Sequence, residues 1–282
     1  MANIQLPGGI VLITGAASGI GKETALAFAE AGVEGILLAD LNEPTEATIA
    51  ECQRFSKNPN FRALTVQTDI TDEASVAKMV ETAVKQFGRV DYCVHAAGMG
   101  SISGARTEHL NIEVFDKTFG VNARGTMLVL RAVSAAMAQQ GPRNHQSYRH
   151  PETTRSLGRG SIVVVSSING NIAAQGMMAY SASKFAGIGI AKSAAVDNVE
   201  NHIRVNTICP SWVDTPMMQA SIKRFPPLEK MIENVSPLRR AALPEEVADL
   251  AVFLSSPSAS YVNGSSLVVD AGLTLPALRN SM

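Results

Sequence analysis

The feature that most constrains the fold is a repeated alternation between short β-branched runs and longer amphipathic stretches. Runs such as IVLIT, GILLA and SIVVV are apolar at every position, as strands covered by helices on both faces must be. Seven runs are expected to be strands, namely 10–14, 35–40, 62–67, 92–96, 161–166, 204–209 and 266–269. The stretches expected to be helices are 19–31, 43–57, 72–87, 113–140, 179–199 and 244–254. This order predicts an α/β fold, a doubly wound parallel sheet of about seven strands with helices on both faces.

No linker-like segment splits the alternation, so we expect one domain spanning residues 1–282. Two stretches interrupt the rhythm. Residues 141–160 are polar, basic and rich in turn formers, which predicts a surface insertion with the character of a tolerated loop. Residues 214–238 carry Met, Ile, Leu and Phe side chains in a short helical pattern around Pro226–Pro227. Because open α/β sheets bind ligands beyond the carboxyl ends of their strands, we interpret 214–238 as a substrate flap; a core segment is the alternative.

Composition excludes several classes of function. The formal net charge is -1, and the only basic cluster, in 141–160, has no interleaved aromatic platform, so we expect no nucleic-acid partner. Cys52, Cys93 and Cys209 lie far apart without CxxC spacing, which argues against a disulfide framework and against a metal site. No apolar stretch reaches the length of a membrane span. We therefore expect a cytoplasmic protein with no membrane span.

The first expected strand leads into the sequence TGAASGIG at residues 14–21, where a helix begins. Glycines let the backbone approach a pyrophosphate, and the amino end of a helix offers free N–H groups and a positive dipole. The alternative is a tight turn that uses glycine for structural reasons alone. The strand–turn–helix context favours a phosphate-binding turn, and with it a Rossmann-type sheet.

Asp40 ends the second expected strand. A carboxylate there can accept hydrogen bonds from both hydroxyls of an adenosine ribose and would repel a 2′-phosphate. A helix cap for the following segment is the alternative. Neither Ser18 nor Leu41 supplies a cation for a phosphate, so the sequence favours NAD as the cofactor.

Tyr180 and Lys184 stand at positions i and i+4 of the sequence YSASK, on one face of an expected helix. A free phenol is a poor base at neutral pH. A fixed ammonium beside it would stabilise the phenolate, so the pair is a candidate acid/base. By itself this spacing is common by chance.

The landmarks together resemble the single-domain branch of the short-chain dehydrogenase/reductase family, over residues 8–272. They occur in the order typical of the family: TGAASGIG at 14–21, Asp40, Asp69, HAAG at 95–98, Asn122, SS at 166–167, YSASK at 180–184, PSWVDTP at 210–216 and VVDAG at 268–272.

The resemblance implies a role for each matching residue. The catalytic residues would be Asn122, Ser167, Tyr180 and Lys184, with Ser167 preferred to Ser166 because of its separation from Tyr180. The cofactor-binding residues would be Gly15, Ser18, Gly19, Ile20, Gly21, Asp40, Asp69, Ile70, Ala96, Ala97, Gly98, Asn122, Tyr180, Lys184, Pro210, Val213 and Thr215. The substrate contacts would be Ser167, Tyr180, Ser211, Trp212, Met217 and Met218.

Three positions depart from the family pattern. His95 replaces the usual asparagine, which we expect to be a structural substitution; a pH-sensitive contact between strands is the alternative. Ser211 replaces a glycine and adds a hydroxyl beside the pocket. The 141–160 insertion resembles those of fungal members that act in secondary metabolism.

The resemblance implies hydride transfer between NAD and a secondary alcohol or ketone, with proton transfer through Tyr180. We expect a mostly apolar substrate, the alcohol-oxidising direction, and a homodimer or homotetramer. An NADP-dependent ketoreductase and a non-catalytic Rossmann sensor or scaffold are the alternatives.

Overall fold

The computed structural model describes residues 4–42, 46–100, 104–147 and 149–275. Its centre is a parallel seven-stranded sheet in the order β3-β2-β1-β4-β7-β8-β9. The strands are β1 (Ile10–Thr14), β2 (Gly35–Asp40), β3 (Arg62–Gln67), β4 (Tyr92–His95), β7 (Gly160–Val165), β8 (Ile203–Pro210) and β9 (Ser266–Val269). The chain winds outward in one direction from β1 and in the other from β4, which confirms the predicted doubly wound sheet.

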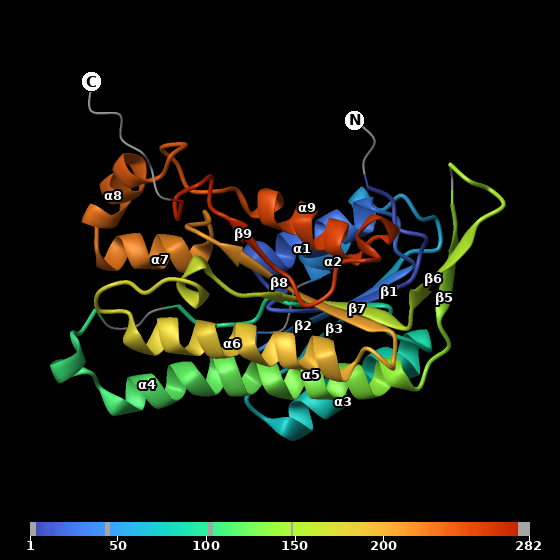
Figure 1. Cartoon of the computed structure of the whole chain (residues 1–282), viewed down its shortest axis with the longest axis horizontal. Coiled ribbons are helices and arrows are strands. Elements are labelled where there is room, and N and C mark those ends of the chain that lie inside the picture. Colours follow the sequence, from blue (N-terminus) through green and yellow to red (C-terminus); the bar gives the residue numbers. More distant parts are fainter. Residues whose placement is uncertain (1–3, 43–45, 101–103, 148, 276–282) are drawn as a thin grey trace.

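Helices cover both faces of the sheet (Figure 1). On one face pack α1 (Gly19–Glu30), α2 (Glu46–Phe55) and α9 (Pro244–Ser255); on the other pack α3 (Glu73–Phe87), α5 (Thr126–Ala138) and α6 (Met178–Asp197). In β1, Val11 and Ile13 enter the first core and Leu12 enters the second. Both sides of the strand are therefore buried, which explains its unbroken apolar run. Among the described residues, no helix is long and apolar enough to cross a membrane.

The shorter elements lie between these layers or after them. They are α4 (Ile112–Phe119), α7 (Pro216–Arg224), α8 (Pro227–Val235), and the single turns η1 (Thr107–His109), η3 (Ile168–Gly170) and η4 (Pro257–Ala259). The expected break at Pro226–Pro227 is confirmed, because α8 begins at Pro227. The expected start of α2 at residue 43 lies outside the described residues.

The expectation of one continuous helix over 113–140 is wrong. A π-helical segment, η2 (Gly120–Gly125), separates α4 from α5. Gly120 and Gly125 bound this segment, and glycine is a poor former of regular helix. A Cβ at Gly125 would lie 3.0 Å from Cδ1 of Ile70, so the wider turn also fits a close approach between chain segments. The result places Asn122 inside the irregular turn.

The 141–160 insertion is on the surface, as expected, but it is not a plain loop. It forms an antiparallel hairpin of β5 (Arg143–Gln146) and β6 (Thr154–Gly158), which stands at the opposite end of the molecule from α7 and α8 (Figure 1).

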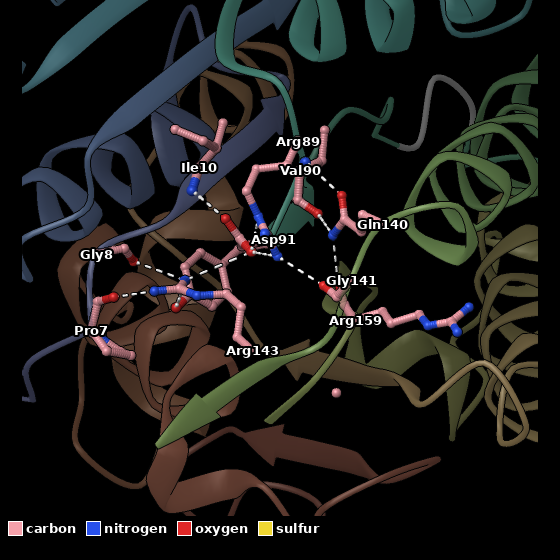
Figure 2. Close-up of polar contacts among 12 residues, drawn as sticks. Pro7, Gly8, Ile10, Arg89, Val90, Asp91, Gln140, Gly141, Arg143 and Arg159 are labelled. Atoms are coloured by element: carbon pink, nitrogen blue, oxygen red, sulfur yellow. Dashed lines mark hydrogen bonds and ion pairs between the residues drawn. The ribbon is translucent and has the colours of Figure 1, made fainter. Parts of the chain in front are cut away.

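Arg143 fastens this hairpin to the amino ends of the central strands (Figure 2). Its guanidinium donates to Pro7 O and Gly8 O, and one of its nitrogens lies 3.7 Å from a carboxylate oxygen of Asp91. The side chain of Asp91 is 2% exposed and also accepts hydrogen bonds from Arg89 Nε at 2.8 Å and Ile10 N at 2.9 Å. A buried carboxylate that keeps its charge requires such donors, which gives the hairpin a fixed point of attachment.

Candidate active site

The glycine turn after β1 packs closely against neighbouring backbone. Gly15 has φ +71°, and a Cβ there would lie 2.7 Å from the backbone nitrogen of Ala97. A Cβ at Gly21 would overlap the carbonyl of Gly15. Ser18 is the N-cap of α1 but its side chain makes no capping bond, and the first turn of α1 contains no acid. No side chain of this turn therefore binds the first N–H groups of α1, which are the groups that a phosphate site uses.

Asp40 lies beside this turn at the end of β2. Its Oδ2 accepts from the backbone N–H of Ala17 at 3.0 Å, and its Oδ1 accepts from the N–H of Asn42 at 3.0 Å. Leu41 is 59% exposed, so the position next to Asp40 faces solvent. The structure thus brings the expected ribose acid to the expected phosphate turn.

Asp69 and Ile70 follow β3. One carboxylate oxygen of Asp69 accepts from both the N–H and the hydroxyl of Thr71, at 2.8 and 2.7 Å, which orders the turn. The side chain of Ile70 is buried against Gly125. These residues form the floor between β3 and the start of α5.

Asn122 uses its whole amide. Its Oδ1 accepts from Met99 N at 2.9 Å, while its Nδ2 donates to Met99 O at 3.0 Å and to Ser183 Oγ at 3.1 Å. The side chain is thus locked to the segment after β4 and to α6. A Cβ at Gly98 would lie 3.1 Å from Asn122 Oδ1 and 3.6 Å from Lys184 Nζ, so both groups flank the glycine that ends the HAAG motif.

Tyr180 and Lys184 lie on α6, as predicted. Lys184 Nζ stands 5.6 Å from the centre of the Tyr180 ring and donates to Val165 O at 3.4 Å. Ser166 and Ser167 follow β7 directly. The hydroxyl of Ser166 donates to the carbonyl of Lys184 at 3.3 Å, whereas Ser167 Oγ accepts from Asn169 N at 3.2 Å. Ser167 keeps its hydroxyl hydrogen free for another acceptor, which supports the choice of Ser167 over Ser166.

The segment after β8 closes the site on the far side. Thr215 caps α7 by accepting from Met218 N at 3.2 Å, and its methyl carbon would lie 3.2 Å from a Cβ at Gly19. Val213 is buried and pairs with Ala242, while Ser211 donates its N–H to Val269 O at 2.9 Å. Trp212 and Met218 are partly buried.

Methionine from α7 reaches the opposite loop. Met217 is 48% exposed, and its Sδ lies 3.2 Å from the Cβ position of Gly100. The apolar side chains exposed in the flap region are Met217, Phe225, Met231, Val235 and Leu238. This exposure favours the flap interpretation over the core alternative, although Ile232 of α8 is buried.

A cavity of about 540 Å³ lies apart from the residues expected to contact substrate. It is bounded by residues 105–108, by the loop 173–176 and by Met178, Ala182 and Phe185 of α6. None of the residues expected to contact substrate is in its wall.

The sequence analysis missed the partners that hold Asn122. Ser183 is inside the YSASK motif, and its hydroxyl donates to Tyr180 O at 2.7 Å while accepting from Asn122. A serine one turn after the candidate tyrosine could have been selected as a helix-bound hydroxyl. Met99 offers only its backbone, so its residue type carries no signal.

His95 is 1% exposed, and both of its ring nitrogens lie within hydrogen-bonding distance of a threonine hydroxyl. Burial, and to a smaller extent the charge of Lys184, lower the pKa of His95 to about 3. The imidazole is therefore neutral at physiological pH, which favours a structural role for His95 over a pH-sensitive contact.

Comparisons with known proteins agree with this geometry. A family model described as Enoyl-(Acyl carrier protein) reductase matches residues 15–274. Short-chain dehydrogenase srdC of Neurospora crassa is 46% identical over 262 residues, which cover 93% of this chain and 95% of that protein. Short-chain dehydrogenase fogB of Aspergillus ruber is 45% identical over 271 residues, covering 96% and 98%.

Solved structures show the same arrangement. The crystal structure of levodione reductase is similar with a TM-score of 0.84 and 30% identity, covering 95% of this chain and 98% of that one. The 3-oxoacyl-[acyl-carrier protein] reductase from Brucella melitensis, in complex with NAD, is similar with a TM-score of 0.81 and 25% identity, covering 96% and 99%.

Proposed function

Because the chain belongs to the short-chain dehydrogenase/reductase family of oxidoreductases, we propose that it interconverts a secondary alcohol and a ketone with NAD as its cofactor. The observation that carries this proposal is the placement of Lys184 Nζ 5.6 Å from the centre of the Tyr180 ring. Lys184 Nζ and the Asn122 amide oxygen both flank Gly98. An acid/base pair at this point lies at the carboxyl ends of β4 and β7, beside the glycine turn.

The glycine turn fits a dinucleotide. A Cβ at Gly15 or Gly21 would clash with the backbone of Ala97 or of Gly15, so this tight turn depends on glycine. No side chain caps the start of α1, which can offer its N–H groups to a pyrophosphate. The adenosine half would lie over Asp40, Asp69 and Ile70. The nicotinamide half would lie along the segments 96–98 and 210–215, with Val213 and Thr215 on the carboxamide. When bound, the nicotinamide ring supplies two-electron exchange with the carbon of the alcohol or ketone.

The chain's own residues handle the proton. As a phenolate, Tyr180 would take the proton of the alcohol, and as a phenol it would return that proton to the ketone oxygen. Ser167 would donate a hydrogen bond to the same substrate oxygen. The ammonium of Lys184 stabilises the negative phenol oxygen through its charge. Asn122, locked by Met99 and Ser183, holds the backbone beside Lys184.

Three features support the finer assignments. Asp40 favours NAD over NADP, and a structural neighbour binds NAD. The exposed apolar side chains of α7 and α8 favour a mostly apolar substrate, in contact with Trp212, Met217 and Met218. We place the reaction in the alcohol-oxidising direction and in secondary metabolism, in keeping with the resemblance of the chain to fungal short-chain dehydrogenases.

The test is a pair of tyrosine variants. Tyr180→Phe should bind NAD as the wild type does, by titration calorimetry, but lose kcat by several orders of magnitude on a panel of cyclic secondary alcohols. Tyr261→Phe, at a fully exposed tyrosine, is the matched control and should keep wild-type kcat. A Tyr180→Phe enzyme with a tenth or more of the wild-type kcat would show that the acid/base has been assigned wrongly.

A further inference from the structure

His95, the last residue of β4, lies between two threonine hydroxyls from different parts of the fold. Its Nδ1 is 2.8 Å from Oγ1 of Thr14, the last residue of β1, where the glycine turn begins. Its Nε2 is 3.0 Å from Oγ1 of Thr126, the first residue of α5, directly after the π-helical segment that contains Asn122. The imidazole thus connects the cofactor turn with the start of α5, the helix that follows the segment containing Asn122.

The hydrogen bonds around the ring determine which nitrogen carries the proton. Thr126 Oγ1 donates its only hydrogen to the carbonyl of Asn122, at 2.7 Å. It can therefore only accept from His95, which requires a hydrogen on Nε2. Nδ1 is then an acceptor and takes the hydroxyl hydrogen of Thr14, which itself accepts from Ala97 N–H at 3.2 Å.

The surroundings keep this neutral tautomer in place. His95 is fully buried, and the charged group that acts on it is the ammonium of Lys184, whose positive charge opposes protonation of the ring. The two polar groups that touch the ring are the uncharged hydroxyls of Thr14 and Thr126. Neither ring nitrogen therefore changes its role over the pH range in which the enzyme works.

We propose that His95 is a positioning residue, which joins Ala97 and Thr14 to Thr126 and Asn122 by hydrogen bonds that all run in one direction. This inference rests on the proposed role of Asn122. The side-chain amide of Asn122 is held by Met99 and Ser183, and its main-chain carbonyl also accepts from the Thr126 hydroxyl. His95 in turn leaves that hydroxyl only one acceptor.

The length of the imidazole explains why histidine suits this position. The two ring nitrogens lie on opposite sides of the ring and reach both hydroxyls at once. An asparagine is shorter: its amide can take the place of Nδ1 beside Thr14, but it does not extend to the place of Nε2. With asparagine at 95, the Thr126 hydroxyl would lose the donor that links it to Thr14.

The first arm of the test is kinetic. Thr126→Val removes the hydroxyl with almost no change of shape, whereas the matched variant Thr126→Ser keeps it. An Asn122 turn held less firmly beside Lys184 should lower kcat of Thr126→Val about tenfold, with the KM for NAD unchanged. Thr126→Ser should keep the wild-type kcat. His95→Asn should resemble Thr126→Val, since both break the same link.

The second arm reads the ring directly. NMR of protein labelled with ¹⁵N at histidine should show His95 as a single Nε2–H tautomer that does not titrate between about pH 5 and 9. An Nδ1–H tautomer, or titration in that range, would overturn the hydrogen-bond direction. This readout needs no variant and no substrate, so it stands even if Thr126→Val folds poorly.

Tyr180→Phe, assayed alongside, separates this inference from the proposed function. Full activity in Tyr180→Phe would overturn the proposed function, and the positioning role with it. If Tyr180→Phe is inactive but Thr126→Val and His95→Asn keep full activity, the positioning role alone is overturned.

Discussion

The carboxylate of Asp40 accepts a hydrogen bond from the backbone N–H of Ala17, with 3.0 Å between Oδ2 and the nitrogen. The acid that ends β2 therefore also holds the glycine turn that follows β1. Its second oxygen accepts from Asn42, which leaves lone pairs on both oxygens for a ribose diol. Removing this side chain would change both the contact with the ribose and the shape of the glycine turn. A test of cofactor preference therefore needs variants that affect one of these without the other.

Asp40→Asn makes that separation. The amide oxygen can still accept from Ala17, but the charge that repels a 2′-phosphate is gone. Hydrogen bonds to a charged group and the repulsion together amount to about 3 kcal/mol, a preference of roughly a hundredfold for NAD in the wild type. Asp40→Asn should narrow this ratio mainly by improving kcat/KM for NADP. Asp40→Ala should weaken both cofactors, because the turn loosens as well.

Adding Leu41→Arg to Asp40→Asn should move the preference towards NADP, since residue 41 is exposed beside the ribose position. Steady-state kcat/KM for both cofactors decides the matter. A wild type that prefers NADP would remove Asp40 from the ribose site.

The attachment of the hairpin predicts a stability effect. Arg143→Ala removes one of the cations that face the buried carboxylate of Asp91, while Arg89 and the N–H of Ile10 remain. We expect the free energy of unfolding in urea to fall by about 1–3 kcal/mol. Arg149→Ala, at an exposed arginine of the same hairpin, should leave it unchanged. Equal stability of the two variants would show that the hairpin is not fastened through Arg143.

The strands of the central sheet could be predicted from the sequence, but the β5–β6 hairpin that is attached to it could not. The β1 and β2 runs were predicted with their bounds, because buried parallel strands are apolar at every position. The hairpin was not predicted, because the contacts that hold it include those of Arg143 with Pro7, Gly8 and Asp91, which lie far from it in the chain. Hydrophobic periodicity reports which face of an element is buried and says nothing of such pairs.

The candidate site divides in the same way. Tyr180 and Lys184 could be paired from their spacing, since a helix brings positions i and i+4 together. The π-helical turn at Asn122 could not be predicted, because it is accompanied by contacts with Met99 and Ser183 that join three separate segments. Gly120 and Gly125 weaken the local preference for a regular helix, but they do not show that a π-helical turn forms.

Exposed apolar side chains on α4 and α6 predict an assembly. Ile112 of α4 is 67% exposed, and Phe185 and Val196 of α6 are 47% and 73% exposed. Such side chains on neighbouring helices are typical of an interface between subunits, in agreement with the expected homodimer or homotetramer. Phe185→Asp should lower the mass measured by sedimentation at micromolar concentration, whereas Val84→Asp on α3 should not. A monomeric wild type would contradict the prediction.

The neutral imidazole of His95 predicts how stability depends on pH. Its pKa is about 3 in the folded protein, through burial and then the charge of Lys184, against an ordinary value of 6.5. Between these two values the unfolded chain binds a proton that the folded protein excludes. The full contribution is present above pH 6.5, and the free energy of unfolding falls as the pH falls, by at most about 1.4 kcal/mol per pH unit. We expect His95→Asn, which has no titrating group there, to lose stability less steeply between about pH 6 and 4 in urea titrations at constant ionic strength. His109→Asn, at an exposed histidine, should keep the wild-type slope. If both variants keep that slope, the buried ring must already carry a proton in the folded protein, and the neutral tautomer between Thr14 and Thr126 would be excluded.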